Sequence, residues 1–290
     1  MAGIRELRQR LASVRSAGKI TTAMQMVASA KLKKASRAVE SFLPYQRKLQ
    51  SILDDFLGSD QEYETYFKQK RVLKRVTLVA FSSNSGFCGS FNAAIIDELR
   101  IQMAKYEGRE LRVITVGKKV SQAVKKMKYK GETESWDRLV VAPTYPDARE
   151  FADHLIDLYR HKKTDKIVLI YFHYKNPLVH ELRTIDYLPI ELEKMKKKPT
   201  SYLHLYIVEP KAPELLMQLM PKVLRSQIYA VLLDSFSSEQ GARTVAMQLA
   251  SENADKLSEE LQLKINRQRQ QMITTEILEL SSAGFQDNDF

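Results

Sequence analysis

Residues 238–280 read SEQGARTVAMQLASENADKLSEELQLKINRQRQQMITTEILEL, and the architecture of the chain follows from the helix that they predict. Leu257, Leu261 and Ile265 recur every four residues, which places them on one face of a helix. Residues 222–283 contain no proline and a single glycine, so nothing in them forces the helix to end. About sixty helical residues span roughly 90 Å at ~1.5 Å each, too long to wrap around a compact core. Such a helix needs a second helix beside it.

The other end of the chain supplies that second helix. Apolar residues from Ile4 to Val14 follow the three- and four-residue steps of a coiled coil. Pro44 is the first strong stop, and a helix that passes a proline is kinked there. We therefore predict an N-terminal coiled-coil helix over residues 1–57 and a C-terminal one over residues 213–284, which ends at a glycine. The two are expected to pair as an antiparallel coiled coil.

Charge is distributed unevenly between these two arms. The net charge is +11, yet residues 1–48 carry eleven Lys/Arg against two Glu, and residues 239–290 carry five basic against nine acidic residues. Opposite charge favours side-by-side packing and its register, although each screened pair contributes little. A basic arm also fits a nucleic-acid-binding protein, which salt-dependent binding to DNA would reveal. Against that alternative, the basic residues interleave with the apolar stripe and no nucleic-acid-binding motif occurs.

The middle of the chain changes period. Three runs of mostly β-branched and aromatic residues, VTLVAF, LRVITV and IVLIYF, suit strands buried on both faces of a sheet. Helix-like stretches separate them, and this alternation predicts a mostly parallel, Rossmann-like α/β domain over residues 70–208, inserted between the terminal helices. The strand runs occupy residues 76–81, 111–116 and 167–172, the helices about 92–106, 118–127 and 146–160, and further strands are expected at 182–190 and 201–208.

The sequence lacks the usual patterns of several kinds of site. No apolar run reaches the ~18–20 residues that a membrane span needs. The single cysteine, Cys88, excludes an internal disulfide and has no evident His or Asn partner for nucleophilic catalysis. The five histidines have no metal-site spacing, and neither GxGxxG nor GxxxxGK followed by Ser or Thr occurs. We therefore expect no catalytic residue, no metal and no cofactor. A nucleotide-binding enzyme is the remaining alternative, and ATP titration would test it.

Both ends of the chain match a known family. Residues 18–35, GKITTAMQMVASAKLKKA, and the C-terminal stretch quoted above resemble the two signatures of the gamma subunits of F-type ATP synthases. The two signatures occur in their proper order, and the resemblance covers almost the whole chain. The matching positions are Lys19, Ile20, Thr21, Ala23, Met24, Met26, Val27, Ala28, Lys31 and Ala35 in the first, and Ser238, Glu239, Ala242, Arg243, Ala246, Met247, Ala250, Asn253, Ala254, Leu261, Asn266, Arg269, Gln270, Ile273, Thr274 and Glu276 in the second.

The loop at residues 81–92, FSSNSGFCGSFN, also resembles the family. A glycine turn between a strand and a helix is where α/β folds bind phosphate, although a tight turn without a ligand is the simpler interpretation. Asn84 and Ser85 replace the acid and the base that are usual in the family, and Phe87 replaces a leucine. The residues that match are Gly86, Cys88, Gly89, Phe91 and Asn92.

The resemblance implies a function without bond chemistry. A gamma subunit is the central rotor shaft of ATP synthase, and its coiled coil turns inside a ring of alpha and beta subunits. It couples proton flow through the membrane c-ring to conformational cycling of the catalytic beta subunits. The implied partners are the alpha, beta and epsilon subunits and the c-ring, with no nucleic acid. The chain is then a peripheral membrane protein on the cytoplasmic face of a bacterial inner membrane.

The resemblance also implies contact residues. Lys19, Met24 and Lys31 on the first helix are expected to contact the alpha–beta ring. On the last helix, the residues expected to take part in ring contacts and coupling are Arg243, Gln270, Thr274 and Glu276. Tyr206 and Glu209 resemble residues that face the c-ring and the epsilon subunit.

The N-terminus allows one alternative. Residues 1–26 are rich in Arg and Ser and poor in acids, which is also typical of a mitochondrial transit peptide. Because the same pattern continues without a break into a longer helix, we expect these residues to belong to that helix. A start without a cleavable extension favours a bacterial protein.

Overall fold

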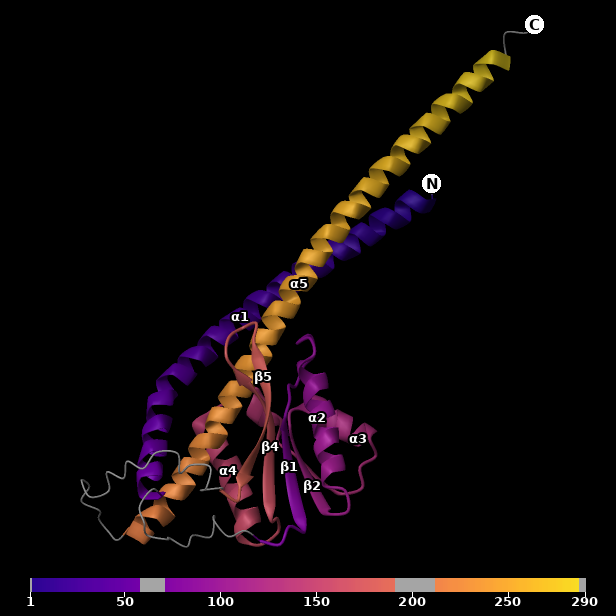
Figure 1. Ribbon diagram of the computed structural model, residues 1–290. Helices are drawn as coiled ribbons and strands as arrows, with labels where there is room; N and C mark the ends of the chain where they lie inside the picture. The colour runs from indigo at the N-terminus through magenta and orange to yellow at the C-terminus, as the bar shows by residue number, and fades with distance from the viewer. Residues whose placement is uncertain (1, 58–70, 191–211, 287–290) are drawn as a thin grey trace. The chain divides into compact units, whose positions relative to one another are not determined.

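The computed structural model describes residues 2–57, 71–190 and 212–286 (Figure 1). Its first and last elements are two long helices, α1 (Ala2–Leu57) and α5 (Ala212–Gln286). Pro44 lies inside α1 and Pro221 inside α5, and neither ends its helix. The predicted stop at Gly284 is wrong, since α5 runs two residues further, to Gln286. A glycine costs a helix only about 1 kcal/mol, too little to force its end.

The chain divides into two compact units. One combines Met1–Val27 with Thr244–Phe290, and the other comprises Ala28–Arg243. Among the described residues of both units, no helix is long and apolar enough to cross a membrane.

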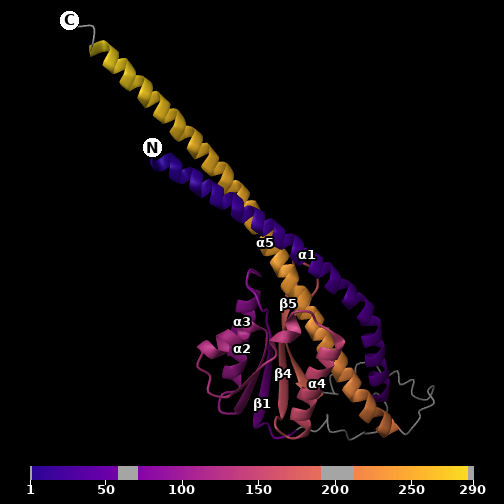
Figure 2. The same cartoon turned by 180° about the vertical axis from the view of Figure 1, so that it is seen from behind.

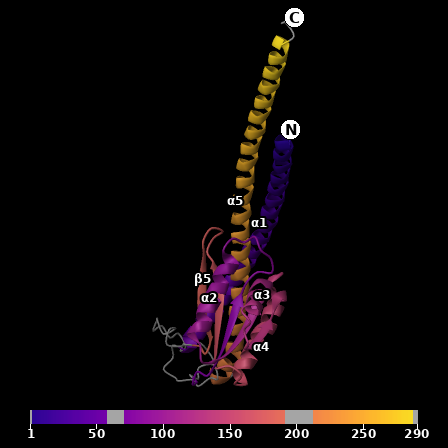
Figure 3. The ribbon, with the colours of Figure 1, turned by 90° about the vertical axis from the view of Figure 1, so that its right-hand side faces the viewer.

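The first unit is the predicted antiparallel coiled coil. Leu11, Leu261 and Ile265 form its buried centre. The guanidinium of Arg15 donates to the side-chain oxygen of Gln262 at 3.3 Å, and nearer the middle of the chain other side chains of α1 meet lower-numbered residues of α5. Residue numbers therefore rise along α1 as they fall along α5, so the helices run antiparallel. The N-terminal part of α1 lies beside α5 in all three views, and α5 extends beyond it (Figures 1 to 3).

Two small residues bring the helices of this unit close together. A Cβ added at Gly18 would lie 3.3 Å from the Cβ of Ala254, so the two helices pack closely at this point. Beside this point the hydroxyls of Thr22 and Ser251 share a hydrogen bond of 2.8 Å. Gly18 thus marks a close contact between the two helices, and α1 continues through it without a break.

The second unit contains a five-stranded sheet in the order β3-β2-β1-β4-β5. The first four strands in this order are parallel, and β5 runs antiparallel beside β4 at the edge. The predicted Rossmann-like α/β fold is therefore confirmed. The strands are β1 (Arg75–Phe81), β2 (Glu110–Val116), β3 (Glu132–Ser135), β4 (Lys166–Tyr174) and β5 (His180–Leu188); the intervening helices are α2 (Phe91–Lys105), α3 (Lys118–Lys126), the 3-10 turn η1 (Asp137–Val140) and α4 (Tyr145–Arg160).

Helices cover both faces of the sheet. In β1, Leu78 belongs to the same buried cluster as Leu99 of α2, whereas Val79 belongs to the same buried cluster as Phe151 of α4. α2 and α4 lie on opposite sides of the sheet (Figures 1 and 2). This double burial explains why the strand runs are continuously apolar. The core on the α4 side also contains Leu224 and other buried residues of α5 up to Leu232. A long terminal helix thus supplies part of the core of the α/β unit. The strand predicted at 201–208 lies outside the described residues.

Candidate functional site

The carboxyl edge of the sheet is where folds of this kind bind their ligands. In a Rossmann-like sheet the binding crevice opens where the strand order reverses, here between β1 and β4. In this chain α5 lies over that position. The hydroxyl of Ser238 donates to the carbonyl of Phe172 in β4 at 3.4 Å, and a Cβ on Gly241 would lie 3.4 Å from Pro177 in the hairpin after β4. The crevice is closed by the chain itself.

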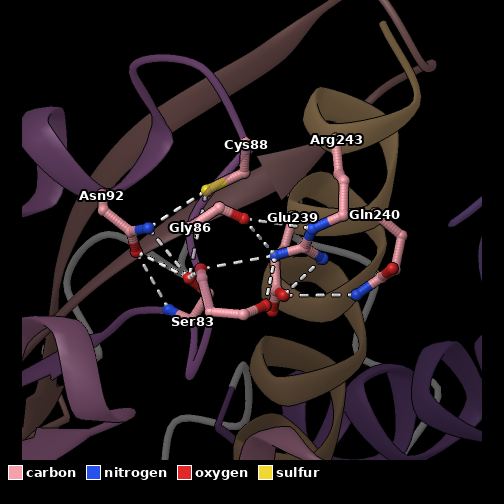
Figure 4. Close-up of polar contacts among 8 residues, drawn as sticks. Ser83, Gly86, Cys88, Asn92, Glu239, Gln240 and Arg243 are labelled. Atoms are coloured by element: carbon pink, nitrogen blue, oxygen red, sulfur yellow. Dashed lines mark hydrogen bonds and ion pairs between the residues drawn. The ribbon is translucent and has the colours of Figure 1, made fainter. Parts of the chain in front are cut away.

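Arg243 fastens the loop after β1 to α5 (Figure 4). Its side chain is only 9% exposed and forms an ion pair of 2.7 Å with Glu239, one helical turn earlier. Its guanidinium also donates to the hydroxyl of Ser85 at 3.0 Å and to the carbonyl of Gly86 at 3.2 Å. Burial raises the pKa of the Glu239 carboxyl, and the charges of Arg243 and Lys31 oppose that rise.

Asn84 and Ser85, the two loop residues that replace an acid and a base, each form hydrogen bonds that suit their side chains. The side chain of Asn84 accepts a hydrogen bond from the backbone N–H of Lys118 at 2.9 Å and donates one to the carbonyl of Asp137 at 2.9 Å. A carboxylate could accept the first bond but could not donate the second. Ser85 presents an oxygen to Arg243, whereas a basic residue would place a second cation there. The departures at Asn84 and Ser85 therefore have a structural reason within this chain.

Asn92 and Cys88 complete the loop. The side-chain oxygen of Asn92 accepts from the backbone N–H of Ser83 at 3.1 Å, and its amide donates to the sulfur of Cys88 at 3.0 Å. Burial raises the pKa of the Cys88 thiol, the opposite of what a nucleophilic cysteine needs. Phe87, with φ 62° and a side chain 69% exposed, projects from the loop. The loop is thus an internally bonded turn with one exposed ring.

The chain resembles known proteins over nearly its full length. A family model described as ATP synthase matches residues 3–284. The ATP synthase gamma chain of Phocaeicola vulgatus is 42% identical over 284 residues, covering 97% of this chain and 98% of that protein. The chain belongs to the ATP synthase gamma-chain family. A gamma chain of Bacteroides fragilis is 43% identical over 285 residues, covering 97% of this chain and 98% of that protein.

Chains in solved structures of ATP synthases share the fold. A chain of the Euglena gracilis mitochondrial ATP synthase matches with a TM-score of 0.67 at 19% identity, covering 98% of this chain and 94% of that one. A chain from the central stalk and c-ring of the Tetrahymena thermophila mitochondrial ATP synthase matches with a TM-score of 0.59 at 24% identity, covering 80% and 99%. The predicted combination of coiled coil and α/β domain agrees with these likenesses.

In this gamma-chain family member the predicted contact residues fall into different environments. Lys19 is exposed and Met24 half-buried in the first unit. Lys31 is exposed in the second unit. Gln270, Thr274 and Glu276 are all exposed on α5, and the Thr274 hydroxyl donates to the carbonyl of Gln270 at 2.9 Å. Tyr206 and Glu209 lie outside the described residues.

Of the predicted contact residues that the structure describes, Arg243 is the one whose side chain is buried. Sequence reasoning missed its partners Glu239 and Ser85. The four-residue spacing of Glu239 and Arg243 on a helix was a usable signal for the ion pair. No sequence signal connects Arg243 to Ser85, which lies 158 positions away.

Proposed function

We propose that this chain is the central rotor shaft of an F-type ATP synthase. It couples proton flow through the membrane c-ring to conformational cycling of the catalytic beta subunits, and it is itself not catalytic. Its partners are the alpha, beta and epsilon subunits and the c-ring. It works as a peripheral component of a membrane-associated complex, on the cytoplasmic face of a bacterial inner membrane. Full-length membership of the gamma-chain family is the observation that carries the proposal.

The surface of the first unit supports this proposal. Ile20, Met26 and Val27 on α1, and Leu249 and Ile277 on α5, are each more than half exposed. Large apolar side chains on a slender helix pair call for a surrounding partner. A shaft shifts its partner only if it binds the partner's conformations with different affinities. An asymmetric helix pair inside a ring meets that condition, because each rotational position presents a different surface to each catalytic subunit.

The contact residues have distinct roles in this proposal. Lys19, Met24 and Lys31 contact the ring from α1, and the exposed residues Gln270, Thr274 and Glu276 do so from α5. For Arg243 we propose a different role from the one its sequence position implies. Its guanidinium is engaged by Glu239 and the loop after β1, so it positions that loop rather than reaching a partner. Tyr206 and Glu209 remain proposed contacts to the c-ring and epsilon, on sequence resemblance alone.

The first test is a pull-down. A tagged copy of the chain is recovered from detergent-solubilised native membranes, and the eluate is assayed for ATPase activity. We expect alpha and beta subunits with an ATPase activity that the purified chain lacks. Recovery of the chain alone, or with nucleic acid, would refute the proposal. Binding of ATP by the isolated chain would instead favour a nucleotide-binding function.

A second test addresses coupling. Gln270→Ala in the assembled complex should lower ATP-driven proton pumping relative to ATP hydrolysis. Gln271→Ala is the matched control, because Gln271 is also exposed on α5 but is not a predicted contact. Equal pumping-to-hydrolysis ratios in the two variants would remove Gln270 from the proposed contacts.

A further inference from the structure

The amino edge of the sheet in the second unit carries a hollow of about 450 Å³. It lies where β1, β2 and β3 begin, on the edge opposite the crevice that α5 closes. The side chains that line it come from the starts of these strands and from the loops that precede the strands. The charged residues among them are Arg75, Arg109, Arg112, Lys130 and Lys163, with Glu110 and Glu132. Cations thus outnumber carboxylates on its walls.

Two of the five cations are neutralised by ion pairs. The Arg75 guanidinium lies 3.2 Å from the carboxylate of Asp165, a side chain only 4% exposed, and Arg112 is paired with Glu132. The other three are exposed, and none forms an ion pair with a residue that the structure describes; these unpaired cations are Arg109, Lys130 and Lys163. Against them, the described lining offers only the carboxylate of Glu110 outside an ion pair. The hollow is therefore left with an excess of positive charge.

The ends of the helices explain other basic residues at this edge, but not the unpaired cations. α2, α3 and α4 all end here, because each is followed within a few residues by the start of a strand. Basic residues in their last turns offset the negative ends of the helix dipoles. The unpaired cations come three or four residues later, one after each helix, and the dipole effect falls off within the last turn. Three separate loops thus bring cations to one hollow.

The loop before β3 is fixed beside the hollow. The hydroxyl of Tyr129 donates to the carbonyl of Leu111 in β2 at 2.5 Å. The ring of Tyr129 lies against Gly131, where an added Cβ would be 2.7 Å from Cε1 of the ring. A larger residue at position 131 would displace the ring. Lys130 stands between these two residues and is held on the wall of the hollow by them.

The path of α5 shows which end of the second unit this edge occupies. Near the amino edge, the Tyr187 hydroxyl donates to the carbonyl of Leu224 at 3.1 Å. At the carboxyl edge, Ser238 donates to Phe172. α5 therefore crosses the sheet from the amino edge to the carboxyl edge, and it leaves the second unit after Arg243. If α5 then enters the alpha–beta ring, as the proposed function requires, the amino edge lies on the side of the c-ring and the membrane.

We propose that this hollow binds a phosphate group through Arg109, Lys130 and Lys163, and that the group belongs to an anionic phospholipid. The guanidinium fork of an arginine matches two phosphate oxygens, and the two ammonium groups add point charges. Free phosphate carries the same group, so the experiment has one arm for each source. The phosphate site follows from the hollow alone, whereas its assignment to a lipid headgroup rests on the proposed function.

The first arm measures binding of the full-length chain to vesicles by sedimentation at low salt. The vesicles contain equal parts of phosphatidylglycerol and phosphatidylcholine, or phosphatidylcholine alone. The hollow variant is Lys130→Gln with Lys163→Gln. The matched control is Lys34→Gln with Lys118→Gln, two exposed lysines that form no ion pair with a described residue and do not line the hollow.

We expect the hollow variant to bind the anionic vesicles about thirtyfold more weakly than the parent, and the control to stay within about threefold of it. Thirtyfold corresponds to about 2 kcal/mol, the contribution of two basic residues at an anionic surface. Lys130→Arg with Lys163→Arg keeps both charges and should bind like the parent. Matching thermal unfolding of all the variants establishes that they are folded.

The second arm titrates inorganic phosphate into the same proteins by calorimetry. A loss of binding in the hollow variant alone supports the phosphate site, and the arm in which it occurs identifies the source. A loss confined to the phosphate arm would make the lipid assignment wrong. Equal losses in the hollow variant and the control would show a general effect of basic charge and would overturn the site, as would a parent chain that binds in neither arm.

The two proposals fail in different ways. If alpha and beta subunits with ATPase activity are recovered while neither arm separates the hollow variant from its control, the phosphate site is wrong and the rotor proposal stands. If the hollow variant alone loses binding but no ring subunit is recovered with the chain, the phosphate site stands and the rotor proposal is wrong.

Discussion

The buried ion pair of Arg243 and Glu239 offers the sharpest test of the structural reasoning. Arg243→Met keeps much of the length of the side chain but removes its charge. The carboxylate of Glu239, 7% exposed, would keep the hydrogen bond from the amide of Gln240 at 3.2 Å and the weaker influence of the Lys31 charge. Removing one partner of a buried ion pair costs about 3–5 kcal/mol, because the other charge is left uncompensated. The bonds to Ser85 and Gly86 are lost as well. We therefore expect the free energy of unfolding to fall by about 3–5 kcal/mol.

The assay is urea unfolding of the isolated chain, followed by circular dichroism. The control is the double variant Glu239→Gln with Arg243→Met, in which neither charge remains. Because replacing a whole buried pair is often nearly neutral, the double variant should lie within about 1–2 kcal/mol of the parent. A single variant that loses less than about 1 kcal/mol, or a double variant that is no more stable than the single one, would refute the reasoning.

The pH dependence of the same variant follows from the sign of the shift. Burial raises the pKa of Glu239, and Arg243 opposes that rise, so the pKa rises further in Arg243→Met. A raised folded-state pKa means that the protonated form is favoured on folding. The stabilisation that protonation of Glu239 gives the folded state is fully present below the unfolded-state pKa of about 4.3. It is lost as the pH rises through the folded-state pKa. The deficit of Arg243→Met should therefore shrink on acidification, and an equal deficit at about pH 5 and about pH 8 would contradict this account.

Three further predictions concern other parts of the chain. Burial would raise the pKa of Asp165, but hydrogen bonds from Arg75 outweigh it and lower the pKa. Asp165→Asn should thus cost about 1–3 kcal/mol above about pH 4 and flatten the loss of stability with acidification below it, measured by urea unfolding across pH. Gly18→Leu should push the helices apart, because even a Cβ at position 18 would lie 3.3 Å from the Cβ of Ala254, and trypsin should then cut the first unit faster than in Gly18→Ala. Cys88, 2% exposed with its thiol pKa raised, should react with a disulfide reagent at least about tenfold more slowly in the native chain than in denaturant.

Sequence reasoning predicted the elements whose signals are local. The long helices follow from apolar residues every three or four positions, and β1, β2 and β4 follow from continuous apolar runs. β3 was missed because its four residues, ETES, are mostly exposed and form no such run. The helix stop at Gly284 was wrong because a glycine only weakens a helix.

The fold class, the antiparallel pairing and the family could be predicted from the sequence alone, because periodicity and signature residues depend on neighbours a few positions apart. Only the tertiary structure showed that α5 closes the crevice at the switch point of the sheet. It also turned Arg243 inward onto Gly86, a residue 157 positions away. A buried polar group takes its partner from whatever folding brings within hydrogen-bond distance, and no local pattern in the chain records that choice.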